Sequence, residues 1–212
     1  MTMPILDVES ILKDSWNHPY DLHPEHHFIN NDRPCVIHAH YWNFKAARAT
    51  LYYLSHLDII HESLNHVDYE PRIDIVLSLA EIIENVFDEL ALKRDMTDRT
   101  SIAIYIEEAK KFPYDFTHTF NLENDSAEIY IPEAELSNDG KAEYISARAI
   151  IANLQRLRVE LVGDIDREAI NMAFESVGPN ERGIIVERLA ALIKASHDAS
   201  DNNCKQSSRF SS

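Results

Sequence analysis

The sequence predicts an α-rich α+β domain, with five or six helices packed on a small, mostly antiparallel sheet. Apolar residues recur at helical spacing along residues 73–90 and 141–162, as they do in helices that bury one face. Residues 35–41 alternate apolar and polar side chains, which indicates a half-buried strand. Residues 115–131 alternate in the same way on either side of a polar loop, so we expect a β-hairpin there.

The chain has the length and composition of one globular domain. It holds 212 residues, of which 45% are hydrophobic and 26% are charged, and this is enough for one substantial core. We therefore expect a single globular domain over residues 1–197. Residues 198–212 show no hydrophobic periodicity and are predicted to be a disordered tail. We detect no internal repeat within the predicted domain.

The N-terminal segment predicts a helix, a loop and a strand. Asp7 is placed to cap a first helix that runs to about Trp16, because the apolar residues between them then share one face. Residues 17–34 contain three prolines and a polar cluster, which predicts a long irregular loop. The strand at residues 35–41 follows this loop.

Two helices follow the strand. Asn43 is placed to cap a helix over residues 44–67, whose apolar residues fall on one stripe. Pro71 fits the first position of a second helix that ends near Leu90. This second helix carries the strongest amphipathic pattern in the chain, with acidic residues opposite its apolar side.

The pattern in the middle of the chain is mixed. Residues 101–112 fit either a strand or a short helix, because alternating isoleucines precede a Glu-Glu-Ala-Lys-Lys run that favours helix. The hairpin at residues 115–131 comes next, and Pro132 ends its second strand or marks it as an edge.

Three helices are predicted in the last third. The first covers residues 141–162, with Gly163 just past its end. The second runs through Ile170 and stops at Gly178, and Asn180 is placed to cap the third.

Charge and cysteine content narrow the class of protein. A formal net charge of −16 argues against nucleic-acid binding, which needs clustered Lys and Arg. Cys35 and Cys204 lie far apart, which argues against a structural disulfide and for a reducing compartment. We find no signal-peptide pattern and no apolar run long enough to span a membrane. We therefore expect a cytoplasmic protein.

Histidines are concentrated in the first third of the chain. Nine of the eleven histidines lie between His18 and His66. On a regular strand His38 and His40 project from the same face, close enough to share Zn or Fe with an imidazole from the preceding loop. The alternatives are that both are half-buried strand residues hydrogen-bonded to their neighbours, or that they form a catalytic pair without metal. The candidate metal ligands are His38, His40, His23, His26 and His27.

Aromatic residues accompany these histidines, and together they suggest a small-molecule pocket. The pocket would lie between the 17–34 loop, the 35–41 strand and the 44–67 helix. The alternative is that the same aromatics close one end of the core. The candidate ligand-binding residues are Tyr20, Phe28, Tyr41, Trp42 and Tyr53.

These features lead to three functional hypotheses. The first is a soluble intracellular ligand-binding or regulatory domain with a His- and aromatic-lined pocket. The second is a metal-dependent enzyme or metal sensor, using Zn or Fe, built on His38 and His40. The third is an acidic interaction subunit that binds a basic protein partner through its helical faces. None of the three involves nucleic acid or a membrane.

Overall fold

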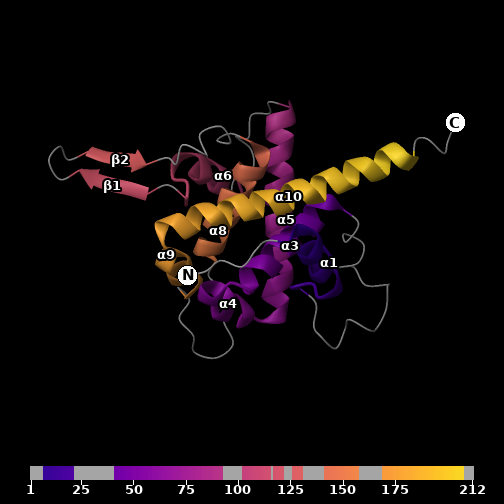
Figure 1. Ribbon diagram of the computed structural model, residues 1–212, viewed down its shortest axis with the longest axis horizontal. Helices are drawn as coiled ribbons and strands as arrows, with labels where there is room; N and C mark the ends of the chain where they lie inside the picture. The colour runs from indigo at the N-terminus through magenta and orange to yellow at the C-terminus, as the bar shows by residue number, and fades with distance from the viewer. Residues whose placement is uncertain are drawn as a thin grey trace.

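The computed structural model describes residues 7–21, 41–92, 102–115, 117–121, 126–130, 141–157 and 169–207. Within these residues the chain forms eight helices and one two-stranded hairpin (Figure 1). The helices are α1 (Val8–Asn17), α3 (Trp42–Ser55), α4 (Asp58–Asn65), α5 (Tyr69–Leu92), α6 (Ile102–Lys111), α8 (Ala142–Arg156), α9 (Ala169–Ser176) and α10 (Pro179–Ser207).

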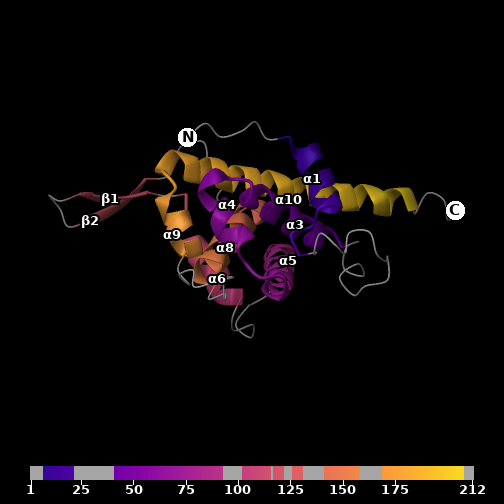
Figure 2. The same cartoon turned by 90° about the horizontal axis from the view of Figure 1, so that it is seen from below.

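The predicted α+β class is wrong, because the helices pack on one another and not on a sheet. The expected hairpin does form. Its strands β1 (Thr117–Asn121) and β2 (Ser126–Tyr130) are antiparallel, with Thr117 opposite Tyr130. Figures 1 and 2 both show this hairpin projecting away from the helices. In the described part of the chain, the core residues lie on the helices and on the short segments that join them.

Several element boundaries also differ from the prediction. The single helix expected over residues 44–67 is interrupted between α3 and α4, where Leu57 adopts an extended backbone (φ −81°, ψ 120°) and is buried. The ambiguous segment 101–112 contains a helix, α6. The last helix starts at Pro179, the favoured first position for proline, and so is not capped by Asn180. It continues to Ser207, into the segment for which we predicted disorder.

The core is centred on α3 and α8, which both pack against α5 and α10. Small residues make this close packing possible, because the buried alanines of α3 and α8 allow neighbouring helices to approach. Fully buried leucines and isoleucines fill the remaining space, among them Leu51, Leu54, Ile150 and Ile151. The long helix α10 runs along both α3 and α8 (Figure 1).

The helices of the first half recur, in the same order, in the second half. The first half (α1, α3, α4, α5) corresponds to the second half (α6, α8, α9, α10). The sequence Ala-Ala-Arg-Ala at residues 46–49 of α3 becomes Ser-Ala-Arg-Ala at residues 146–149 of α8. Each of α1 and α6 is followed by Pro-Tyr-Asp, at residues 19–21 and 113–115. The buried pattern of α5 is repeated at a constant offset in α10.

The Pro-Tyr-Asp segments make the same contacts in both halves. The Tyr20 hydroxyl donates a hydrogen bond to the carbonyl of Leu64 on α4, at 2.7 Å. The Tyr114 hydroxyl donates to the carbonyl of Phe174 on α9, at 2.5 Å. In each half the tyrosine therefore joins the end of one helix to another helix of the same half.

The aspartates of these segments each bind the arginine of the repeated Ala-Arg-Ala sequence. Arg48 donates to Asp21 through Nε at 2.9 Å and Nη2 at 2.8 Å. Arg148 donates to Asp115 through the same two atoms, at 2.8 and 2.9 Å. All four side chains are at most 5% exposed. Two bidentate ion pairs thus occupy equivalent buried positions.

A second arginine is repeated at the start of α5 and α10. Arg72 donates from Nε to the carbonyl of Val67 at 2.8 Å, and Arg182 donates from Nε to the carbonyl of Val177 at 2.9 Å. The guanidinium groups lie 4.8 and 4.9 Å from the ring centroids of Tyr20 and Tyr114. The repeat therefore extends to side-chain geometry.

The packing between the halves is reciprocal. Helix α3 contacts α10 as α8 contacts α5, and α4 contacts its own counterpart α9. This reciprocity is what a two-fold relation between two similar units requires. The prediction that the chain contains no internal repeat is therefore wrong. The two halves have the same pattern of buried positions and a few polar residues in common. The residues between these positions are mostly different.

Candidate functional site

The predicted metal ligands lie outside the described residues. His23, His26, His27, His38 and His40 all fall between residues 22 and 40, as does Phe28. Within the described ranges, no three His, Cys, Asp or Glu side chains come close enough to hold a metal ion. The site at His38 and His40 stays a prediction.

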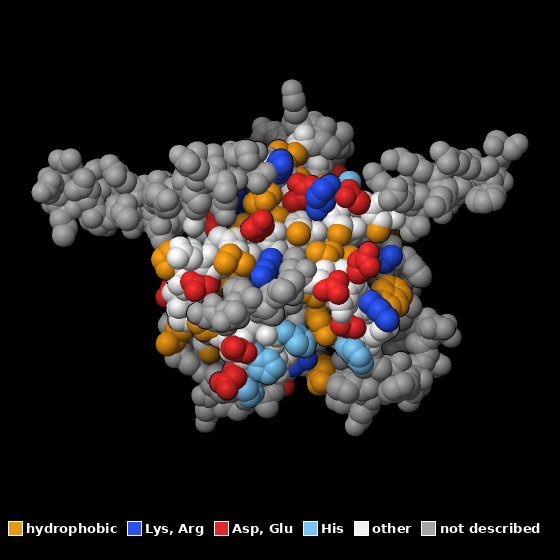
Figure 3. Space-filling view, viewed as in Figure 1, with side chains coloured by type: hydrophobic (Ala, Val, Ile, Leu, Met, Phe, Trp, Pro, Cys, Tyr) orange, Lys and Arg blue, Asp and Glu red, His pale blue; other side chains and the backbone are white. Residues whose placement is uncertain are grey.

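The described histidines of α3 and α4 bind the backbone. The Nδ1 atoms of His56, His61 and His66 lie 2.6–2.7 Å from the carbonyls of Tyr52, Ser55 and Glu62 respectively. Figure 3 shows histidine side chains gathered near α4, beside acidic side chains. These imidazoles satisfy carbonyls near the ends of α3 and α4, which is a structural role.

The described aromatic candidates do not converge on one cavity. Tyr20 and Tyr53 are buried, and burial raises the pKa of both hydroxyls. Tyr53 accepts a hydrogen bond from Arg188 at 3.1 Å, so it joins α3 to α10. Trp42 packs edge-on against the rings of Phe87 and His197, whereas Tyr41 is 58% exposed. The packing of Tyr20, Tyr53 and Trp42 matches the alternative in which the aromatics close the core.

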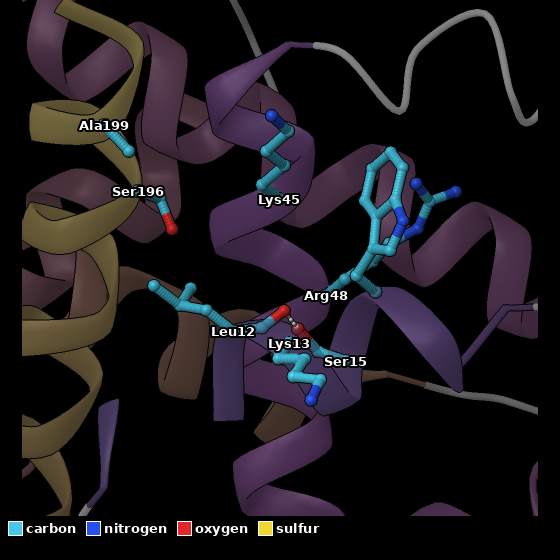
Figure 4. Close-up of a pocket in the computed structure, with 8 residues that line it drawn as sticks. Leu12, Lys13, Ser15, Lys45, Arg48, Ser196 and Ala199 are labelled. Carbon is cyan, nitrogen blue, oxygen red and sulfur yellow. Dashed lines mark hydrogen bonds between the residues drawn. The ribbon is translucent and has the colours of Figure 1, made fainter. Parts of the chain in front are cut away.

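A cavity of about 320 Å³ lies elsewhere, between α1, α3 and α10 (Figure 4). Each helix contributes residues spaced three or four apart, because such residues share one helix face. The described residues that line it are Leu12, Lys13, Ser15, Trp16, Lys45, Arg48, Ser196 and Ala199. None of these described residues carries a carboxylate, imidazole or thiol.

The buried polar groups of this cavity are held in place by the protein. Arg48 is fixed by its two hydrogen bonds to Asp21. Ser15 Oγ donates to the carbonyl of Leu12 at 3.0 Å, and Ser196 Oγ donates to the carbonyl of Leu192 at 2.9 Å. Each hydroxyl oxygen keeps the capacity to accept a further bond. The inner wall is therefore rigid, with only a few polar atoms to offer.

The positive charge at the cavity comes mainly from Lys45. This side chain is half-buried, and its Nζ lies 5.6 Å from the ring centroid of Trp16. Among the described residues, Lys45 forms no ion pair. Lys13 is exposed and points in the opposite direction in Figure 4. An aromatic face and an ammonium group thus lie side by side on an otherwise acidic protein.

The equivalent region, between α6, α8 and α5, is filled with apolar side chains. Ile145 of α8 stands at the position of Lys45 in α3, and Val86 of α5 stands at the position of Ser196 in α10. Both are buried, with 5% and 1% of their surface exposed. Ile106, the counterpart of Leu12, is fully buried. Core packing between α6, α8 and α5 therefore replaces the inner wall of the cavity.

An ion pair spans the outer part of the same region. Lys110 and Glu89 occupy the positions equivalent to Trp16 and Ala199, and their Nζ and Oε1 atoms are 3.1 Å apart. This contact links α6 to α5, whereas the equivalent positions of α1 and α10 leave an opening. The two regions share a framework, but among the described residues one is open and the other is closed.

Sequence reasoning missed these residues because no motif marks them. Trp16 and Lys45 were assigned to helices without a functional role. The available signal was the pair of Pro-Tyr-Asp and Ala-Arg-Ala sequences, since aligning the two halves on them exposes the differences at Trp16, Lys45, Ser196 and Ala199.

Comparison with known proteins gives this chain no relative: no family model, no curated protein and no solved structure matches it. A search of the described helices for a membrane-spanning segment found none with the required length and apolarity. Any functional conclusion therefore depends on the site itself.

Proposed function

We propose that the protein is a ligand-binding domain that takes one small molecule into the cavity between α1, α3 and α10. The ligand-binding class is the one that the sequence favoured, but the site is different. It is formed by the first and last helices together with α3, and not by the 17–34 loop and the strand that follows it.

The observation that carries this proposal is the difference between the halves. Between α6, α8 and α5 the repeated framework is closed by the buried side chains of Val86 and Ile145. Between α1, α3 and α10 the corresponding positions hold Ser196 and Lys45, and a cavity is present there. A hollow of about 320 Å³ lies at the lower end of the range for small-molecule pockets.

The chemistry of the lining favours binding over catalysis. General acid–base or nucleophilic chemistry uses an imidazole, a carboxylate, a thiol or an activated hydroxyl. Its described lining residues offer two hydroxyls, both bonded to backbone carbonyls, together with ammonium and guanidinium groups and the indole of Trp16. Apolar walls with a few fixed polar atoms are typical of a binding pocket.

The test covers the opening of the cavity with the residues found at the equivalent positions of α6 and α5. The double variant Trp16→Lys/Ala199→Glu would place a counterpart of the Lys110–Glu89 ion pair between α1 and α10. A thermal-shift screen of a small-molecule library, followed by calorimetry, would compare this variant with the wild-type protein. The matched control is Lys110→Ala/Glu89→Ala. It changes the equivalent positions of α6 and α5 and leaves the cavity between α1, α3 and α10 as it is.

We expect library compounds that stabilise the wild-type protein and the control saturably, and that bind the closed variant at least tenfold more weakly. Compounds that bind all three proteins equally would place the site elsewhere. A library without any stabilising compound would also contradict the proposal.

A further inference from the structure

We propose that the ligand of this cavity is a small aromatic carboxylate, with its carboxylate on Lys45 and its ring beside Trp16 and Leu12. This inference rests on the proposed function, and it names the class of ligand. It follows from the charge, the aromatic surface and the size of the cavity.

The positive charge of Lys45 at the cavity indicates an anionic ligand. Arg48 is already matched by Asp21 through two hydrogen bonds, so it adds no net charge to the inner wall. Lys45 is half-buried beside an indole ring, and among the described residues no carboxylate pairs with it. The equivalent position in the second half is filled by Ile145, which shows that the framework tolerates an apolar residue here. A half-buried ammonium at such a position favours an anionic ligand.

The apolar surface indicates a ring. Trp16 is 49% exposed, and it stands at the cavity next to the partly buried Leu12. In the second half the same position carries Lys110, whose charge is used in an ion pair. A planar apolar group that covers the indole would remove exposed aromatic surface from water and form an offset or edge-on aromatic contact.

The size limits the ligand. A volume of about 320 Å³ lies at the lower end of the range for pockets that hold drug-sized molecules. One or two fused rings with a single carboxylate would fill it. The hydroxyls of Ser15 and Ser196 can each accept one further hydrogen bond, which would suit a donor on the ring.

The test uses two probes of nearly the same shape, 2-naphthoate and its neutral amide 2-naphthamide. Isothermal titration calorimetry would measure both on the wild-type protein and on Lys45→Met. We expect the wild-type protein to bind 2-naphthoate at least tenfold more tightly than the amide. The variant should lose this preference through weaker binding of the carboxylate, with amide binding unchanged.

Two further variants serve as controls. Lys45→Arg keeps the charge and should retain the preference, and Lys111→Met should retain it because that exposed lysine of α6 is not among the residues that line the cavity. Far-UV circular dichroism would establish that each variant is folded. The preference should also weaken with added salt, because the ion pair is only half-buried.

The possible failures are distinct. Equal binding of both probes that is lost in Trp16→Lys/Ala199→Glu would overturn the carboxylate and leave the cavity as the binding site. A preference that survives Lys45→Met would show that another group holds the anion. If neither probe binds the wild-type protein, the ligand class is wrong, and the library screen then decides the proposed function separately.

Discussion

Removing one carboxylate from a repeated ion pair should destabilise the protein strongly. In the variant Asp115→Ala, the guanidinium of Arg148 loses two hydrogen bonds of 2.8 and 2.9 Å at a place where the two side chains are 1% and 0% exposed. Breaking a buried pair from one side costs about 3–5 kcal/mol, because the remaining charge stays buried without its counter-ion.

Urea unfolding followed by circular dichroism would measure the effect. With a denaturant dependence of about 2 kcal/mol/M, the expected loss lowers the midpoint by about 1.5–2.5 M. Asp21→Ala should produce a similar shift, because the pair with Arg48 has the same geometry and burial.

Two controls separate the pair from a general effect of substitution. Lys194→Ala breaks an exposed ion pair with Asp198 and should leave the midpoint unchanged within error. The double variant Asp115→Ala/Arg148→Met should recover much of the loss, because no charge is left buried. A midpoint shift below about 0.5 M for both aspartate variants would refute the claim that these buried pairs stabilise the fold, and clearly unequal shifts would refute their equivalence.

Three further predictions concern the rest of the fold. Burial raises the pKa of the Tyr20 and Tyr114 hydroxyls, so as the pH rises the unfolded chain loses these protons before the folded protein does. The free energy of unfolding should therefore fall above about pH 10, by about 1.4 kcal/mol per pH unit for each tyrosine. Urea midpoints at pH 9 and pH 11 should therefore differ less in Tyr20→Phe/Tyr114→Phe than in the wild-type protein, and equal differences would contradict this. His197→Phe introduces the residue found at the equivalent position, Phe87, and should change the unfolding free energy by less than about 1 kcal/mol. His197→Ala should cost about 1–2 kcal/mol in the same urea titration, because two ring contacts are lost. Replacing residues 117–130 by a Gly-Ser linker should lower the melting temperature by less than about 4 °C, because the hairpin projects from the helices; a larger drop in calorimetry would show that it supports the core.

Local patterns in the sequence predicted the elements well where periodicity was strong. Asp7 caps the first helix as expected, since its side chain accepts a hydrogen bond from the Ser10 amide at 3.2 Å. The hairpin near residues 115–131 also forms, at β1 and β2. These features depend on short-range geometry, which local sequence encodes directly.

The fold class failed because it depended on how the elements pack. Alternation over a few residues does not show whether a hairpin lies under the helices or projects from them. The break at Leu57 also has no local signal, because it serves the burial of that side chain against other helices. Both are tertiary effects that override local propensity.

The candidate site could not have been read from composition. The histidine-rich segment drew attention because it was unusual, whereas the cavity is lined by common residues brought together from α1, α3 and α10. Ser196 and Ala199 become informative only beside Val86 and Glu89. That comparison requires an alignment of the two halves, which the contacts of Arg48 and Arg148 make secure.

The most direct test of the asymmetry between the halves is amide NMR of the protein titrated with 2-naphthoate. Chemical-shift changes should cluster on α1, α3 and α10 around Trp16 and Ser196, with little change around Lys110 and Val86 at the equivalent positions. Equal changes in both regions, or changes confined to residues outside this cavity, would contradict the claim that the region between α1, α3 and α10 is open while its counterpart between α6, α8 and α5 is closed.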